Sequence, residues 1–389
     1  MRIVYLSYWS FSEGLTQSSV IPHLRILSTF PWIEEIYFLT IERGQTEKRT
    51  LSIDKVIYQP LYSLGLPIGI VNKISDFALF PRQIAALVRE KKVDHLICRT
   101  ALGGALGYLV HKKVGASFIV ESFEPHADYM LEAGVWSRSG LKYRFQKYWE
   151  DKVIANASHI VTVSKHFTAL LKSVYDVDCY TFGCAVDTDQ FRFDPEKRQT
   201  IRDRLGWDTR LVGIYVGKFG DIYYDQKAFD IFRKAFDFFG SAFRLIILSP
   251  NPKNTITARM QAVGIPIDNC LIDLVPHHEV PGYLSASDFA FSMVRPAPVR
   301  LYCSPIKDGE YWANGLPILS GDQIGEDSDI IKEEQAGAIF KDDLSDLQAA
   351  LEEIKVLAVK KDRLGSIRDV AMKYRSFQQL PRLYQALLS

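Results

Sequence analysis

The sequence predicts an α/β protein made of two successive, doubly wound parallel sheets, and three observations support this prediction. At 389 residues, the chain exceeds what one hydrophobic core usually organises, so two domains of roughly 200 residues each are expected. Short apolar runs alternate with longer helical patterns, which is typical of parallel α/β layering. A second series of such runs begins at 211–217 and repeats the alternation of the first. Because ligands of such sheets bind at the carboxyl ends of the strands, two facing sheets are expected to form a cleft.

The elements follow from these runs in order. In the first half, strands are expected at 2–7, 35–40, 53–58, 94–98, 116–121 and 159–163. Helical patterns are expected near 17–30, 72–92, 102–113, 140–156 and 164–174, the last of them N-capped by Ser164. In the second half, strands are expected at 211–217, 243–248, 270–274, 288–292, 316–320 and 337–340. Asp187, Asp189, Asp194, Pro195 and Gly206 interrupt the periodicity within 187–208, which predicts domains at 1–190 and 191–375 and a C-terminal helix within 376–389.

Composition and charge limit the function classes. A hydrophobic content of 47% and a charged content of 24% are those of an ordinary folded protein. The formal net charge of +1 argues against nucleic acid as the main partner. Five scattered cysteines without a CxxC pair indicate reduced thiols. No run of 18 apolar residues occurs, so no membrane-spanning helix is expected. Met1 leads directly into an expected strand rather than into a signal peptide. A cytoplasmic protein is therefore expected.

The most informative stretch is residues 304–317. Ser304 is a good N-cap residue, and Pro305 suits the first position of a helix. A capped helix start offers free backbone N–H groups and a positive dipole end, which suit a phosphate group. Lys307 and Glu310 lie three residues apart and therefore share one face of that helix. A cation for phosphate beside a carboxylate for sugar hydroxyls suits a nucleotide-sugar, although a short capped helix with two surface charges remains the plainer alternative.

This stretch reads Ser-Pro-x-Lys-x-x-Glu-Tyr-x-Ala-x-Gly-x-Pro. It resembles the donor-binding segment of the retaining GT-B glycosyltransferases of the bacterial glycosyltransferase family 4 type. The resemblance implies the GT-B fold, two Rossmann-like domains facing a central cleft, with a C-terminal helix that crosses back to the first domain. It also implies transfer of a sugar from a nucleotide-diphosphate sugar to a hydroxyl of a glycan or glycolipid acceptor, with retention of the anomeric configuration.

The resemblance assigns the donor-binding residues to the second domain. Ser304, Pro305, Lys307 and Glu310 would form the main donor site, with Glu310 holding the nucleotide ribose. Gly217 and Lys218, just after a strand, would approach the donor diphosphate, although a structural turn with a solvated lysine is an alternative. Lys218 and Lys307 would stabilise charge on the leaving diphosphate. The family often has a further acidic residue where this chain has Tyr302.

Candidates on the acceptor side lie in the first domain. Glu13 and Gly14 follow the first strand and could pass close to the sugar or acceptor, with a plain strand-to-helix turn as the alternative. His126 lies just past the fifth strand and could assist proton movement near neutral pH. A lone histidine is often structural, and the two interpretations are about equally supported.

Two further features concern partners and cofactors. Residues 136–152 mix basic and aromatic side chains, which suits a peripheral contact with an anionic membrane surface, although inward-facing aromatics would serve core packing instead. No phosphate-binding loop, nucleophile elbow or HExxH pair occurs, and no Asp-x-Asp pair lies where metal-dependent glycosyltransferases need one. No metal and no cofactor beyond the nucleotide-sugar co-substrate are therefore expected. A nucleotide-sugar hydrolase or epimerase and a non-catalytic nucleotide-binding member of an assembly remain alternatives.

Overall fold

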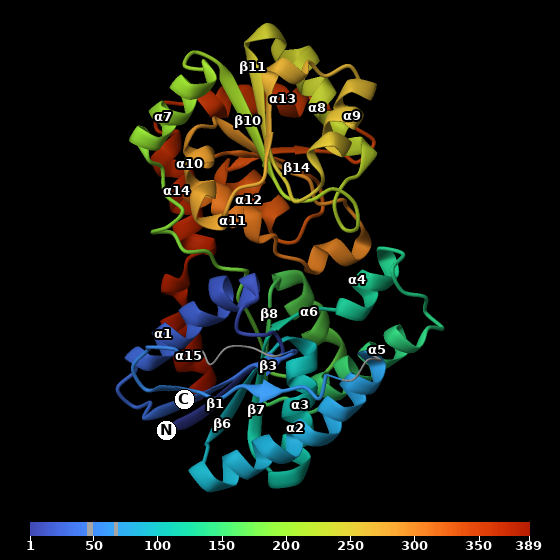
Figure 1. Cartoon of the computed structure of the whole chain (residues 1–389), viewed down its shortest axis with the longest axis vertical. Helices are drawn as coiled ribbons and strands as arrows, with labels where there is room; N and C mark the ends of the chain where they lie inside the picture. Colours follow the sequence, from blue (N-terminus) through green and yellow to red (C-terminus); the bar gives the residue numbers. More distant parts are fainter. Residues whose placement is uncertain (45–49, 66–68) are drawn as a thin grey trace. The chain divides into compact units, whose positions relative to one another are not determined.

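The computed structural model describes residues 1–44, 50–65 and 69–389 and divides into two compact units. Unit 1 comprises Met1–Gly183 and Phe377–Ser389, and unit 2 comprises Cys184–Ser376. Each unit contains one large, fully parallel sheet, so the prediction of two doubly wound α/β sheets is confirmed (Figure 1).

The sheet of unit 1 has seven strands in the order β4-β2-β1-β6-β7-β8-β9. These strands are β1 (Arg2–Ser7), β2 (Glu35–Leu39), β4 (Val56–Tyr58), β6 (His95–Arg99), β7 (Ser117–Phe123), β8 (His159–Thr162) and β9 (Cys179–Thr181). A separate parallel pair consists of β3 (Ile41–Glu42) and β5 (Leu61–Tyr62). The central strands are almost wholly apolar and buried, because helices cover both faces of a parallel sheet.

Helices lie on both sides of this sheet. They are α1 (Ile21–Thr29), α2 (Gly69–Lys91), α3 (Thr100–Val114), α4 (His126–Glu132), α5 (Leu141–Ile154), α6 (Lys165–Val174) and α15 (Leu380–Leu388). Figure 1 shows α1 and α15 on one side and α2, α3 and α5 on the other. The C-terminal helix α15 contributes Leu380, Leu383 and Tyr384 to the same apolar cluster as Ile3 and Tyr5 of β1. The two ends of the chain therefore share one core.

The sheet of unit 2 has six strands in the order β12-β11-β10-β13-β14-β15. They are β10 (Leu211–Val216), β11 (Phe243–Leu248), β12 (Cys270–Asp273), β13 (Phe289–Ser292), β14 (Ile318–Gly321) and β15 (Gly337–Phe340). One face packs on α8 (Gln226–Phe239), α9 (Lys253–Ala262) and α13 (Leu347–Val359). The other face packs on α7 (Pro195–Leu205), α10 (Val280–Ser285), α11 (Ile306–Ala313), α12 (Asp327–Glu334) and α14 (Arg363–Tyr374), as Figure 1 shows.

The main difference from the sequence prediction is α7, which occupies much of the segment where the sequence periodicity is interrupted. Asp194 is its N-cap and accepts hydrogen bonds from the N–H groups of Glu196 and Lys197, both at 3.0 Å. Gly206 ends the helix in the left-handed conformation, with φ of 66°. Two of the residues interpreted as breakers, Asp194 and Gly206, are therefore the caps of a helix, and Pro195 is its first residue. Ser164, in contrast, is confirmed as the N-cap of α6, since its side chain accepts from the N–H of His166.

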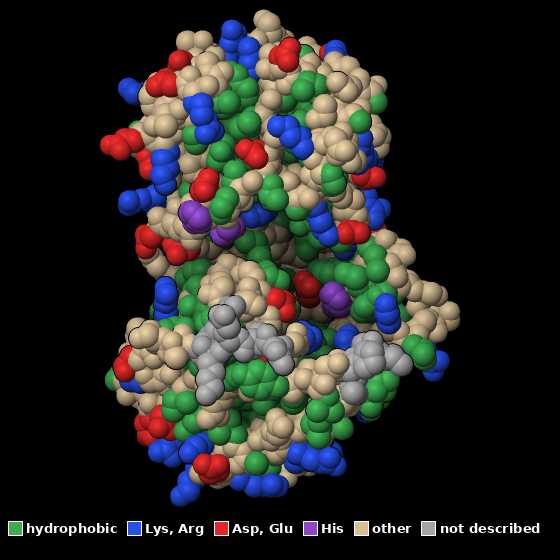
Figure 2. All heavy atoms as spheres, viewed as in Figure 1, with side chains coloured by type: hydrophobic (Ala, Val, Ile, Leu, Met, Phe, Trp, Pro, Cys, Tyr) green, Lys and Arg blue, Asp and Glu red, His purple; other side chains and the backbone are tan. Residues whose placement is uncertain are grey.

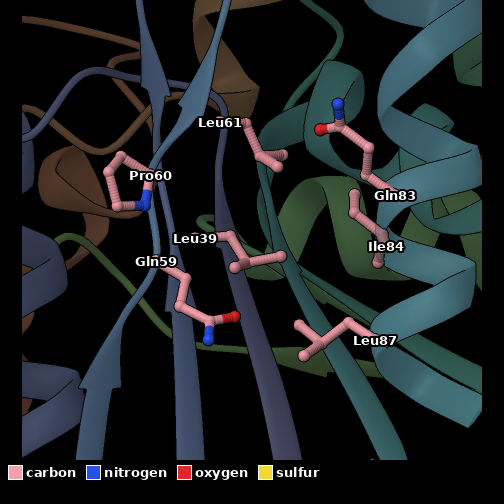
Figure 3. A pocket seen from close by; sticks show the side chains of 7 residues that line it. All are labelled: Leu39, Gln59, Pro60, Leu61, Gln83, Ile84 and Leu87. Carbon is pink, nitrogen blue, oxygen red and sulfur yellow. The ribbon is translucent and has the colours of Figure 1, made fainter. Parts of the chain in front are cut away.

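Three further features of the structure concern charge, membrane-spanning helices and cavities. Charged side chains of both signs are distributed over the face of each unit seen in Figure 2, consistent with the near-zero net charge. Within residues 1–44, 50–65 and 69–389, no helix combines the length and apolar character needed to cross a membrane. Unit 1 contains an apolar hollow of about 170 Å³. Figure 3 shows Leu39, Leu61, Ile84 and Leu87 around this space, which lies between the sheet and α2. None of the residues predicted to be functional lines this hollow.

Candidate active site

The predicted pair of Lys307 and Glu310 forms in the structure and includes a third residue. On α11, Lys307 Nζ lies 2.8 Å from Glu310 Oε2, as expected for residues one helical turn apart. His277 Nε2 lies 3.1 Å from the other carboxylate oxygen, Glu310 Oε1. His277 belongs to the short helix His277–Glu279 after β12, far from α11 in sequence. Sequence reasoning missed His277, because no spacing rule relates it to Glu310.

Glu310 is held as a buried anion. Its side chain is 4% exposed, whereas those of Lys307 and His277 are 33% and 48% exposed. Burial alone would raise the pKa of Glu310, but the charge of Lys307 and the hydrogen bond from His277 hold it below its usual value. Since an ionised carboxylate can only accept, the His277 Nε2 proton must point toward Glu310. The site therefore presents an acceptor oxygen pair with a solvent-accessible cation beside it.

The start of α11 differs from the prediction. The helix begins at Ile306 rather than Pro305, and the N-cap position is occupied by Pro305, which makes no side-chain capping bond. Ser304 is not the N-cap, because its hydroxyl is engaged elsewhere. Ser304 Oγ accepts the N–H of Cys184 at 2.9 Å and also accepts a hydrogen bond from Arg375.

The loop after β10 lies against α11. The N–H of Val216 donates to Tyr311 Oη at 3.0 Å, which joins the end of β10 to α11. A Cβ atom added at Gly217 would lie 2.9 Å from Tyr215 Oη, so only glycine fits this backbone position without a shift. Lys218 is half exposed and its Nζ lies 2.5 Å from Asp221 Oδ2. Lys218 lies on the loop after β10, and its side chain is paired with Asp221, a contact that the sequence analysis did not predict.

Tyr302 ends a short 3₁₀ helix, Pro298–Tyr302, two residues before Ser304. The position that is often acidic in the resembled family is therefore a tyrosine here. Among residues 1–44, 50–65 and 69–389, no cluster of three or more His, Cys, Asp or Glu side chains could hold a metal ion.

The acceptor-side candidates all lie in unit 1. Glu13 Oε1 accepts the N–H of Ser10 at 3.1 Å and lies 3.8 Å from Arg43 Nη1. Gly14 has an exposed α-carbon whose added Cβ would meet nothing within 4 Å, so neither space nor backbone angle requires glycine. Glu13 therefore has a defined structural role in the turn, whereas the structure gives no packing reason for Gly14.

His126 is the first residue of α4, directly after the loop that leaves β7. Its side chain is 39% exposed, and its ring edge packs against Trp136 with centroids 5.6 Å apart. The next residue, Ala127, donates its N–H to Glu150 Oε1 at 3.0 Å. Burial raises the pKa of Glu150 to about 7, although Gln146 and the Ala127 N–H oppose the shift. Glu150 is therefore a buried side chain that anchors the segment carrying His126.

No protein-family model matches the chain, and no curated protein sequence matches it significantly. Solved structures match it over its whole length. Sucrose-phosphate synthase from Thermosynechococcus elongatus has a TM-score of 0.74 at 13% identity, covering 100% of this chain and 99% of that one. HepE from Anabaena in complex with UDP has a TM-score of 0.70 at 9% identity, with the same coverage. WaaG, a glycosyltransferase involved in lipopolysaccharide biosynthesis, has a TM-score of 0.65 at 13% identity, again covering 100% and 99%. The chain therefore has the GT-B fold, the architecture of the family 4 type of glycosyltransferase that its donor motif resembles.

Proposed function

We propose that this protein is a retaining glycosyltransferase that moves a sugar from a nucleotide-diphosphate sugar to a hydroxyl of a glycan or glycolipid acceptor. The observation that carries this proposal is the trio of Lys307, Glu310 and His277 on and beside α11, in a chain with the GT-B fold throughout. Fold alone does not determine activity, so the proposal depends on this site.

The chemistry follows from the charges of the trio. Glu310 is the ionised acceptor for the ribose hydroxyls, and His277 and Lys307 keep it ionised. The ammonium of Lys307, one-third exposed, is available to a diphosphate near the start of α11. On donor binding, Lys218 would leave its ion pair with Asp221 and contact the diphosphate instead. Gly217, which has no side chain, lets the backbone approach the diphosphate closely. Two lysines and a helix start can stabilise the leaving diphosphate without a metal ion.

Ser304 and Pro305 fix where α11 begins, and they contribute to donor binding through that position. In unit 1, His126 is proposed to contact the reacting sugar or the acceptor hydroxyl from the start of α4. Glu13 and Gly14 are proposed to form the acceptor loop. Because Gly14 has open space around its α-carbon, a ligand group could approach the backbone there.

A donor screen tests the proposal. UDP, GDP and ADP, together with their hexose conjugates, should be examined by thermal shift, since a ligand of the folded state raises the melting temperature. HepE, which has been solved with UDP and with UDP-glucose, makes UDP the first probe. Product analysis with and without candidate glycan acceptors then separates the alternatives. Turnover without acceptor would indicate a hydrolase or epimerase, and binding without any product would indicate a non-catalytic member.

We also propose that a surface of unit 1 makes a peripheral contact with the cytoplasmic face of an anionic membrane. Phe145 and Trp149 pack on Phe77 of α2, so these aromatics of α5 serve the core. Leu141 and Tyr148, in contrast, are exposed on the same helix. Exposed Lys142 and Arg144 lie beside them, and neither forms an ion pair with a carboxylate in the described part of the chain.

Basic side chains beside exposed apolar ones suit an interface with acidic lipids. In the described part of the chain none of the five cysteines forms a disulfide, which supports a reducing compartment. Flotation with vesicles of anionic or purely zwitterionic lipids tests this surface. The double variant Lys142→Glu/Arg144→Glu should lose binding to anionic vesicles, and Lys112→Glu/Lys113→Glu on α3 is its charge-matched control. Equal binding by both variants would contradict the assignment.

A further inference from the structure

Two stretches of chain join unit 1 to unit 2, and within unit 2 they lie side by side. We refer to residues 184–186 and 375–376 as the joining segments. The N–H of Val186 donates to the carbonyl of Arg375 at 2.7 Å, and Val186 forms a parallel bridge with Ser376. The joining segments therefore behave as one short piece of sheet.

Arg375 fastens this piece to the donor motif. Its side chain is 3% exposed and donates to Ser304 Oγ and to Asp327 Oδ1, and also to the carbonyl of Cys184 at 3.3 Å. Ser304 Oγ also accepts the Cys184 N–H at 2.9 Å. Ser304 is therefore hydrogen-bonded to both joining segments, through Cys184 of one and Arg375 of the other.

The helix that follows Ser304 packs directly on the same segments. A Cβ atom added at Gly309 would lie 3.1 Å from Val186 Cγ1 and 3.3 Å from Arg375 Cβ. These distances are too short for an unstrained contact, so glycine at position 309 allows α11 to lie this close. Lys307 and Glu310 project from another side of the same helical turn. The joining segments and the side chains of Lys307 and Glu310 are consequently connected through the backbone of one helix, α11.

The charges beneath α11 make this arrangement sensitive to Arg375. Asp308 and Asp327 are fully buried beside one another, and Arg375 donates to Asp327 Oδ1. Burial and the neighbouring Asp327 raise the pKa of Asp308 well above its usual value. Arg375 is the cation that balances this buried pair of carboxyl groups. Removing Arg375 would leave a buried carboxylate without its cation, which is a costly state.

We infer that Arg375 is a positioning residue for donor binding, which couples occupation of the site at Lys307 and Glu310 to the geometry of the joining segments. The inference rests on the proposed function, because it requires a nucleotide to bind on α11. Arg375 itself touches neither donor nor acceptor in this scheme, and acts only through Ser304, Asp327 and the contact at Gly309.

Hydrogen exchange of the full chain with and without UDP tests the inference. In the wild type, UDP should slow exchange of the amides of Cys184 and Val186, although neither residue belongs to the proposed nucleotide site. Arg375→Lys retains a cation, but its single Nζ cannot take the places of both Nη1, which bonds Ser304 and Cys184, and Nη2, which bonds Asp327. This variant should still bind UDP, while UDP no longer protects the two amides. Its kcat should fall about 10–100-fold with little change in KM, since misplacement by about 1 Å can cost that much.

Gly309→Ala provides a second variant in case Arg375→Lys fails to fold. It retains every hydrogen-bonding side chain and places a methyl group against Val186, so it should also uncouple UDP binding from protection. Lys373→Ala is the control, because Lys373 lies on α14 just before Arg375, is 62% exposed and pairs at the surface with Glu334. It should behave as the wild type.

The outcomes separate the two proposals. If UDP, GDP and ADP all fail to bind the wild type, the proposed function and the coupling are both overturned. If a nucleotide binds without protecting Cys184 and Val186, or if both variants keep the protection, only the coupling is overturned.

Discussion

Replacing Asp308 by asparagine should stabilise the protein, and the gain should increase with pH. Asp308 is fully buried on α11 beside Asp327, and burial and that neighbour both raise its pKa. Asparagine has nearly the same shape and supplies an N–H donor toward Asp327. The substitution therefore replaces a carboxyl group whose ionisation the fold disfavours with an amide that does not ionise.

The sign of the pH dependence follows from the direction of the pKa shift. Burial and Asp327 raise the folded-state pKa of Asp308 well above 3.8. Below about pH 4 both the folded and the unfolded state are protonated, so the stability linked to this group is fully present. As the pH rises, the unfolded state ionises freely while the folded state holds its proton, and stability is lost until the pH passes the folded-state pKa. The Asp308→Asn substitution removes this loss.

The magnitude is of the order found for a buried polar group that is imperfectly paired, which costs about 1–3 kcal/mol. For a domain of this size each kcal/mol shifts Tm by about 2–4 °C. Asp308→Asn should therefore raise Tm by about 2–12 °C near pH 8 and by much less near pH 5. Thermal melts of the wild type, Asp308→Asn and the exposed control Asp362→Asn across this range measure it. A variant that melts below the wild type at pH 8, or a difference independent of pH, would refute the reasoning.

Three further predictions concern the site itself. Lys307→Ala should lower kcat about 10²–10³-fold, because its charge matters most as the diphosphate leaves, whereas Glu310→Ala should mainly weaken nucleotide binding. Calorimetry with a nucleoside diphosphate, beside steady-state kinetics, separates these effects, and wild-type turnover by Lys307→Ala would exclude that lysine. His126→Ala should impair transfer and leave nucleotide affinity nearly unchanged, so lost affinity would place His126 on the donor side. Transfer should persist in EDTA, and activity that returned only with added manganese or magnesium would contradict charge stabilisation by lysines.

Much of the fold was predictable because burial on both faces leaves a plain sequence signal. The strands expected at 2–7, 243–248 and 337–340 match β1, β11 and β15 at both ends, and the strand expected at 211–217 differs from β10 by one residue. Segments without that signal were missed, including β9 at the edge of its sheet and the short helix α4. Helix α7 was missed for another reason. Residue types such as Asp, Pro and Gly occur both at the ends of helices and in turns that interrupt them. Only the surrounding chain decides which role applies to Asp194, Pro195 and Gly206.

Within the site, local spacing predicted local contacts only. The Lys307–Glu310 pair is a property of one helical turn and was correctly expected. The contacts of His277 with Glu310 and of Arg375 with Ser304 join residues distant in sequence, so they depend on tertiary packing. The expected capping role of Ser304 was wrong for the same reason, because its hydroxyl is taken by groups that only the fold brings near.

The contrast between Asp308 and Glu310 explains how α11 can serve both binding and anchorage. The two side chains lie two residues apart and are both buried, yet the pKa of Asp308 is raised and that of Glu310 is lowered. Burial acts in the same direction on both, so the partners decide the outcome. Glu310 faces a lysine and a histidine, while Asp308 faces another carboxylate. The same helix can therefore carry one carboxyl group whose ionisation is favoured and, two residues away, one whose ionisation is disfavoured.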